Sequence, residues 1–126
     1  LYPVQKFDSD AERKLAVILE REALKWFRPA RGQFQLFYEF GGSPHEYQPD
    51  FVAETAHAVL MLEPKARSEL DAPEVRAKRK AAELWCERAT AHATAHRGKP
   101  WRYALLPHDV IAENVTLDVL LRQFGA

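Results

Sequence analysis

Three charged residues lie at the ends of two neighbouring hydrophobic segments: Asp50 in "YQPDFVAE", and Glu63 and Lys65 in "AVLMLEPK". Charged side chains are rarely fully buried unless they pair with one another or bind a metal. Carboxylate oxygens, with water and a substrate phosphate, are the ligands that Mg²⁺ prefers. A neighbouring ammonium can hold a water or help to deprotonate it. Brought together, the three residues would have the groups needed for metal-assisted hydrolysis of a phosphodiester bond.

The two segments are predicted to form one antiparallel hairpin, with strands over roughly 46–54 and 58–63. A two-residue turn would favour Asn-Gly or a similar pair, which is absent, so a four-residue loop over 55–58 is expected. Both turns are centred at the same point and give the same register. In that register the opposed pairs are Glu54 with Val59, Val52 with Met61, Asp50 with Glu63, and Gln48 with Lys65.

Directly opposed residues share one face of a sheet, so Asp50 is expected to face Glu63, with Lys65 on the same face. Pro49 and Pro64 oppose each other on the other face, where neither can donate a ladder hydrogen bond. The hairpin is therefore expected to open at this end.

Two opposed carboxylates repel each other and destabilise a strand pair, whereas a bound divalent cation reverses the sign of that effect. The alternative is an ordinary surface ion pair at a strand end, which contributes only about 0–1 kcal/mol. That alternative gives no reason for Asp50 to face Glu63, so we favour a functional role for both acids and for Lys65.

The first element that must support this hairpin is a helix over 9–27. Ser9 and Glu12 form a capping box at its start. Pro29 is expected to end it, because the residue before a proline disfavours helical geometry. Residues 1–8 are predicted to be an irregular lead-in.

Further along the chain, apolar periodicity predicts a strand at 32–40, a loop at 41–44, a second helix from Asp71 to Gly98, a strand at 101–107 and a short helix at 116–124. Pro73 lies in the first turn of the second helix and Glu74 completes another capping box. The run "AVLML" is apolar on both faces, which is typical of a covered central strand. The order α-β-β-β-α-β-α predicts an α/β fold with a mixed four-stranded sheet flanked by helices.

The composition of 126 residues, 47% of them hydrophobic, suits a single domain over 1–126 and excludes disordered, fibrous and disulfide-rich classes. Eighteen acidic and eighteen basic residues balance, so any basic surface must be local. The single Cys86 favours a reducing, cytoplasmic setting. No signal peptide or membrane-length apolar run is visible. A chain that begins at Leu1 is expected to be a fragment of a longer protein.

Pro49-Asp50, followed by Glu63-Pro64-Lys65 at the end of a hydrophobic strand, resembles the PD-(D/E)xK nuclease signature. The α-β-β-β-α-β order resembles the restriction-endonuclease-like core. More narrowly, the blocks "YQPDFVAET", "LMLEPK", "KRKAAELWCERA" and "KPWRYALLPH" resemble the C-terminal nuclease domain of the helicase-nuclease (Res-type) subunits of type III and related restriction systems. The resemblance extends from about Phe7 to Phe124. The turn "TAHA" departs from it, because it lacks an expected glycine.

The resemblance implies an endonuclease in which Asp50 and Glu63 bind Mg²⁺, with Mn²⁺ as a substitute, and Lys65 positions the attacking water. It implies double-stranded DNA as substrate, an ATP-driven helicase or translocase region elsewhere in the polypeptide, and a separate modification and recognition subunit. The chain itself has no GxxxxGK[ST] motif for ATP. Cleavage of both strands implies two copies, as a dimer or as two complexes that meet.

Five further residues have both an ordinary and a functional interpretation. Glu12 is a helix cap, but it also lies on the inward face, and nucleases of the resembled fold often supply another acid from the first helix, as a metal or water ligand. Lys78 lies on the inward stripe of the second helix, where it either snorkels to the surface or contacts a phosphate. The run "RAKRK" around it is either a solvated face or a contact to the DNA backbone, through Arg76, Arg79 and Lys80.

Other candidates are weaker. Gln48 could orient Lys65, and Arg97, Lys99 and Arg102 could extend the basic surface. His92 and His96 have the spacing of helical zinc ligands but no third ligand, so they are expected to face solvent. Cys86 and the three tryptophans are expected to pack in the core.

Two other functions stay open. The chain could be a DNA-binding or assembly module that keeps the fold but does not cut, or a structure-specific resolvase or repair nuclease of the same fold. Loss of cleavage with retained binding after Glu63→Ala would separate the enzyme from the first alternative.

Overall fold

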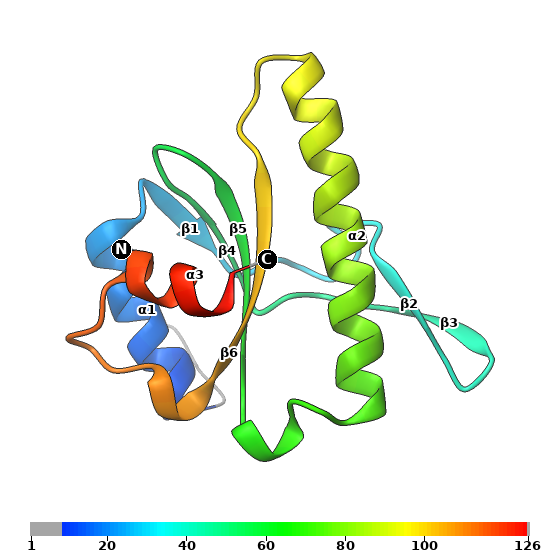
Figure 1. Ribbon diagram of the computed structural model, residues 1–126, viewed down its shortest axis with the longest axis horizontal. Helices are drawn as coiled ribbons and strands as arrows, with labels where there is room; N and C mark the ends of the chain where they lie inside the picture. Colours follow the sequence, from blue (N-terminus) through cyan, green and yellow to red (C-terminus); the bar gives the residue numbers. More distant parts are fainter. Residues whose placement is uncertain (1–8, 126) are drawn as a thin grey trace.

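The computed structural model describes residues 9–125, so the predicted lead-in at 1–8 lies outside the described residues. The described helices and strands are, in order, α1 (Asp10–Glu22), β1 (Lys25–Phe27), β2 (Phe37–Phe40), β3 (Ser43–Glu46), β4 (Phe51–Glu54), β5 (Val59–Lys65), α2 (Pro73–Ala95), β6 (Trp101–Pro107) and α3 (Leu117–Phe124) (Figure 1). Short 3₁₀ turns precede α2 and follow β6.

The central sheet has four strands in the order β1-β4-β5-β6. β1 pairs antiparallel with β4, and β4 pairs antiparallel with β5. β6 lies parallel to β5, because helix α2 carries the chain back to the same end of the sheet. The predicted α/β fold with a mixed four-stranded sheet is confirmed.

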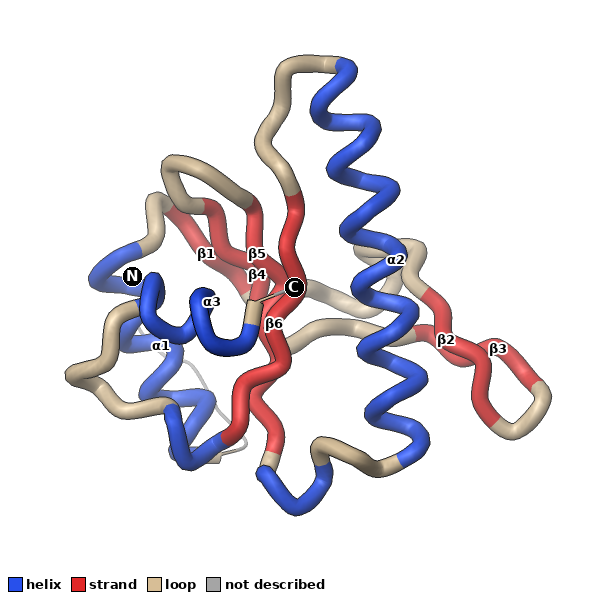
Figure 2. Tube along the Cα trace, viewed as in Figure 1, coloured by secondary structure: helices blue, strands red, loops and turns tan. Residues whose placement is uncertain are grey.

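Helices cover both faces of this sheet, as Figures 1 and 2 show. Leu60 and Leu62 of β5 point into a core shared with α1 and α3. Met61 points the other way, into a second core with α2. β5 is therefore a covered central strand, as its uninterrupted apolar run predicted.

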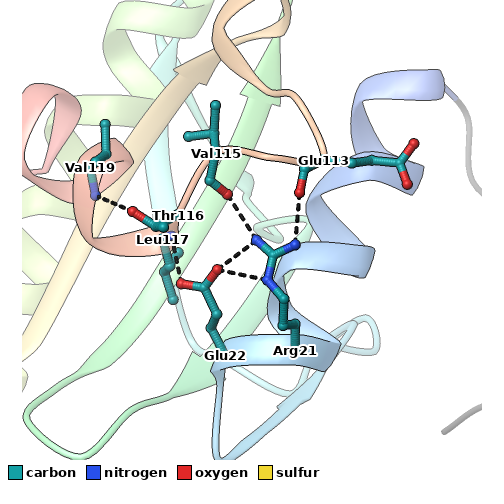
Figure 3. A network of polar contacts seen from close by, with 7 residues as sticks. All are labelled: Arg21, Glu22, Glu113, Val115, Thr116, Leu117 and Val119. Atoms are coloured by element: carbon teal, nitrogen blue, oxygen red, sulfur yellow. Dashed lines mark hydrogen bonds and ion pairs between the residues drawn. The ribbon is translucent and has the colours of Figure 1, made fainter.

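A polar network joins α1 to the segment that leads into α3 (Figure 3). The Arg21 guanidinium donates to the carbonyl oxygens of Glu113, at 2.7 Å, and Val115, at 2.9 Å. It also contacts the Glu22 carboxylate, whose other oxygen accepts from the Leu117 N–H at 2.9 Å. Thr116 caps α3 through the Val119 N–H, so two helices distant in sequence are fixed on one face.

The first helix is shorter than the 9–27 predicted. It ends at Glu22, because Ala23 adopts an extended conformation and Leu24 donates its N–H to the Glu54 carbonyl oxygen. The next three residues become the edge strand β1. The aromatic residues at 26 and 27 favour a strand, and pairing with β4 outweighs the helical spacing on which the prediction relied.

Of the strand predicted at 32–40, only β2 (Phe37–Phe40) forms, and it belongs to a separate two-stranded sheet that projects beside α2 (Figure 2). β2 and β3 are joined by Gly41 and Gly42, whose φ values of 64° and 81° suit a tight hairpin turn. The predicted loop at 41–44 is therefore half strand. Of the strand predicted over 46–54, residues 51–54 form β4, Glu46 is the last residue of β3, and residues 47–50 are not in a strand.

The second helix starts later than predicted. Ala72, not Asp71, is its N-cap, with no side-chain hydrogen bond, and Pro73 occupies the first turn. The fixed φ of proline and its missing N–H make it a favourable first helical residue. The helix ends at Ala95, just before Arg97 in a left-handed conformation. The predicted strand at 101–107 and the closing helix are confirmed.

Candidate functional site

The predicted hairpin register is confirmed. Glu54 pairs with Val59 and Val52 pairs with Met61, and the Thr55 N–H donates to the Ala58 carbonyl oxygen across the four-residue loop. The β4–β5 ladder stops at Phe51 and Leu62, one position before the two acids. Here the two prolines remove main-chain donors, and the strands separate as expected.

Asp50 and Glu63 meet where the strand pair opens. The Asp50 N–H donates to Glu63 Oε1 at 3.1 Å. Both residues are partly buried, and alternation along β5 puts Glu63 and Lys65 on the face of Met61, which α2 covers. The expectation that the two acids face each other is met.

Burial and repulsion both act on this acid pair. Burial raises the pKa of Glu63, and the nearby Asp50 charge raises it further. Burial also raises the pKa of Asp50, with a contribution from the Glu12 charge. The Arg28 and Lys65 charges, and a side-chain hydrogen bond with Glu63, lower the pKa of Asp50. The pair therefore holds a proton at a pH where isolated carboxyls have lost theirs.

Lys65 is the cation closest in sequence to the pair. Its charge lowers the pKa of both acids, although within residues 9–125 its ammonium has no hydrogen bond and no carboxylate partner within 4 Å. The ammonium is thus near two carboxylates without being neutralised by either. Such a group is free to hold a water or a phosphate oxygen.

Glu12 reaches the site from α1. It is 7% exposed, as its inward position predicted, and its N–H donates to the Ser9 hydroxyl. Its carboxylate accepts from Arg28 at 2.9 Å, and the Arg28 guanidinium lies 5.3 Å from the centroid of the Phe51 ring. The backbone part of the capping box is confirmed, and the side chain forms an ion pair beside Asp50. Its role as a further ligand stays a prediction.

Sequence reasoning missed two tyrosines and Arg28. The Tyr47 hydroxyl donates to Glu63 Oε1 at 2.9 Å and lies 3.0 Å from the Tyr103 hydroxyl. Both tyrosines are buried, and a buried hydroxyl needs a polar partner. The place of Tyr47 directly before "QPD" could have predicted that it lies near the acid pair. The position of Tyr103 depends on a distant strand and could not.

Lys78 lies over two aromatic rings on the inward side of α2, and its contact to a phosphate stays a prediction. Its ammonium is 5.6 Å from the Tyr38 ring centroid and 5.7 Å from the Tyr47 ring centroid. Arg76, Arg79 and Lys80 are exposed on the same helix, with Arg79 bonded to Glu83 at 3.2 Å. The structure therefore brings Lys78 toward the acid pair and leaves the other three on the surface.

The weaker candidates are placed as follows. Gln48 donates its amide to the Pro29 carbonyl oxygen, which corrects the suggestion that it orients Lys65. Lys99 pairs with Glu54 at 2.6 Å, and Arg102 donates to the Leu121 carbonyl oxygen.

The structure confirms the positions expected for the residues that were given no functional role. His92 and His96 are exposed with stacked rings, and Cys86 is buried with its sulfur 3.8 Å from that of Met61. Trp26, Trp85 and Trp101 pack against the two cores.

The donor set suits one kind of ion. Within residues 9–125, no group of three or more His, Cys, Asp or Glu side chains is placed to hold a metal. Two partly buried, mutually repelling carboxylates remain. Mg²⁺ is commonly bound by one or two carboxylates, while waters and substrate phosphates supply its other oxygens. Asp50 and Glu63 therefore fit an ion of this type in the presence of a phosphate, and do not form a closed structural site.

No family model matches the chain, and no curated protein matches it in sequence. Within the described part of the chain, the helices are too short or too polar to traverse a bilayer.

Proposed function

We propose that the chain is a metal-dependent endodeoxyribonuclease domain of the PD-(D/E)xK type, which hydrolyses phosphodiester bonds of double-stranded DNA. The observation that supports this most directly is the register of β4 and β5, which opposes Asp50 and Glu63 at the end of a hairpin with Lys65 on the same face. A structural ion pair would not place two acids together.

Asp50 and Glu63 would hold the ion, and Mg²⁺ when bound supplies Lewis-acid polarisation of the phosphate and a more acidic water. Lys65 orients the attacking water and stabilises the negative charge that develops on the phosphate oxygens. Arg28 pairs with Glu12, and its charge lowers the pKa of Asp50, so it offsets part of the repulsion that the Glu12 charge adds to the acid pair.

DNA would approach across the α2 side. Arg76 and Lys80 are exposed on α2, and Lys78 of the same helix lies over the ring of Tyr47, whose hydroxyl donates to Glu63. Basic side chains on the helix that covers the acid pair suit contacts to a phosphate backbone whose scissile bond lies at the acids. By its resemblance, the domain would work with an ATP-driven motor, a separate recognition subunit and a second copy that cuts the other strand.

The test is cleavage of supercoiled plasmid by the purified chain in Mg²⁺ or Mn²⁺, with EDTA as the negative control. Glu63→Gln and Asp50→Asn are expected to lower the cleavage rate at least about 100-fold while DNA binding in EDTA is kept. Glu87→Gln, on the exposed side of α2, is the matched control and should cut like the parent. Equal cleavage by parent and Glu63→Gln would refute the proposal.

The same assay separates the alternatives. If the parent binds DNA but does not cut, and Mn²⁺ does not bind to it, the chain is a non-catalytic binding or assembly module. Preference for flaps or four-way junctions over linear duplex would identify a structure-specific nuclease instead of a restriction module.

A further inference from the structure

Tyr47 occupies a fixed position between β3 and β4. It is 4% exposed, and its N–H donates to the Leu36 carbonyl oxygen at 2.9 Å. Its ring meets those of Tyr38 and Tyr103 edge to face, at centroid distances of 6.4 and 6.5 Å. A side chain held on three sides has little freedom to place its hydroxyl elsewhere.

The hydroxyl of Tyr47 determines which oxygen of Glu63 is occupied. Glu63 Oε1 accepts from both the Tyr47 hydroxyl and the Asp50 N–H. Since Tyr47 has one hydroxyl proton and gives it to Oε1, Tyr103 must be the donor in the 3.0 Å contact between the two tyrosines. The chain of donors ends on Oε1, so Oε2 is the Glu63 oxygen that receives no hydrogen bond from either tyrosine.

The ring of Tyr47 holds a different group. The Lys78 ammonium lies over it and over Tyr38, at a distance typical of a cation–π contact. Within residues 9–125, Lys78 has no carboxylate within 4 Å, so its charge is available to an anion. One side chain therefore contacts both an acid of the site and a basic residue that reaches it from α2.

We propose that Tyr47 is a positioning residue that couples Glu63 to Lys78: its hydroxyl directs Glu63 Oε2 toward the metal, and its ring holds Lys78 against a neighbouring phosphate of the DNA strand. This inference rests on the proposed nuclease function and assigns separate roles to the hydroxyl and the ring of Tyr47. The hydroxyl acts on metal affinity, and the ring with Lys78 acts on DNA affinity.

Two variants separate the two roles. Tyr47→Phe keeps the ring and removes the hydroxyl, so Mn²⁺ affinity measured by calorimetry at fixed pH is expected to fall about 10–100-fold, with DNA affinity in EDTA unchanged. Lys78→Met keeps the hydroxyl contacts, so Mn²⁺ affinity should stay within about twofold. Its DNA affinity should fall, and the slope of log K against log salt should become shallower by about one.

Tyr38→Phe is the matched control. It removes a hydroxyl that bonds Glu74, outside the acid pair, and keeps a ring beside Lys78. Its metal and DNA affinities should both equal those of the parent. Thermal unfolding without metal verifies that each variant folds. If Tyr47→Phe does not fold, Tyr103→Phe tests the same donor chain, with an expected loss of about two- to fivefold in Mn²⁺ affinity.

Unchanged Mn²⁺ affinity in a folded Tyr47→Phe variant would overturn the inference. It would also be overturned if Lys78→Met lost as much Mn²⁺ affinity as DNA affinity. The Glu63→Gln variant distinguishes failure of the coupling role of Tyr47 from failure of the proposed nuclease site. If it abolishes Mn²⁺ binding while Tyr47→Phe does not weaken it, only the coupling role fails. If Glu63→Gln binds Mn²⁺ like the parent, the proposed nuclease site fails with it.

Discussion

Two polar clusters in this molecule are built on opposite electrostatic rules. In the network around Arg21 and Glu22, a guanidinium meets carbonyl oxygens and a carboxylate, and that carboxylate accepts from the first N–H of α3 (Figure 3). At the end of the β4–β5 hairpin, Asp50 and Glu63 are opposed, and Lys65 stays close without neutralising either.

The difference separates a stabilising cluster from one that costs stability. Charge-assisted hydrogen bonds to matched partners fasten α1 to α3. Opposed, partly buried carboxylates lower the stability of the folded chain at neutral pH, because each raises the free energy of the other's ionised form. A fold tolerates such a pair when a ligand offsets the repulsion, which is why this end of the sheet is the functional candidate.

The largest expected effect comes from removing one acid. Glu63→Gln should abolish Mn²⁺ binding to the apo protein, a loss of at least about 100-fold in affinity, because a neutral amide is a poor ligand for a hard cation. Isothermal calorimetry measures it. Glu22→Gln, in the network around Arg21, should leave Mn²⁺ affinity unchanged. A loss of Mn²⁺ affinity in this variant would show that the two clusters do not differ in metal binding.

The reverse pattern is expected for Arg21→Met. Two hydrogen bonds to carbonyl oxygens and an ion pair are lost, so the free energy of unfolding should fall by about 1–2 kcal/mol, reduced by the partial exposure of the side chain. Chemical denaturation measures this change, and Mn²⁺ affinity is the control. A variant as stable as the parent would show that the network does not fasten the two helices.

The pH dependence of stability should report the acid pair. The folded-state pKa of Asp50 is raised to about 6 and that of Glu63 to about 8, in both cases first by burial. The stabilisation of the protonated pair is therefore complete below the ordinary carboxyl range and is lost as pH rises through these values. The free energy of unfolding without metal should fall by at least about 1 kcal/mol between pH 5.5 and 8.5.

Glu63→Gln should remove most of that fall, because its amide does not titrate. The comparison is made by denaturant unfolding in EDTA at several pH values. Parallel curves for parent and variant would mean that the acids are not coupled as described.

The smallest expected effect concerns the exposed basic face. Lys80→Gln should weaken DNA binding less than tenfold at moderate salt and make the salt slope shallower by about one, because one phosphate contact is lost. Lys14→Gln, on α1 and paired with Asp10, is the control and should keep the parental slope. If the salt slopes of DNA binding are equal in the parent and both variants, DNA does not contact this face of α2.

Much of the site could be predicted because its geometry is local. The period of two in a strand and an even-numbered loop together determine that Asp50 opposes Glu63, whichever of the two loops is chosen. The prolines on the other face also predicted where the pairing would stop. No information from distant parts of the chain was needed for either result.

The features that the sequence did not predict correctly depend on contacts between distant parts of the chain. Trp26 was assigned to a helix because its spacing suits one, but edge pairing with Ala53 of β4 outweighs that spacing. The partners Tyr103 and Arg28 reach the site from other parts of the chain, through β6 and the segment after β1. Sequence spacing alone cannot place them, since their positions follow from the parallel crossover and from the packing of α1.

The parallel pairing of β5 with β6 also sets the order in which the site is assembled. The hairpin that opposes the acids joins neighbouring segments, whereas Tyr103 must come from about forty residues away, across α2. Contacts of short separation form with less loss of chain entropy, so the acids first meet while water still screens them. Their mutual repulsion grows only when β6 and α2 exclude that water. The penalty should therefore act on the lifetime of the native state and spare the rate at which the chain reaches it.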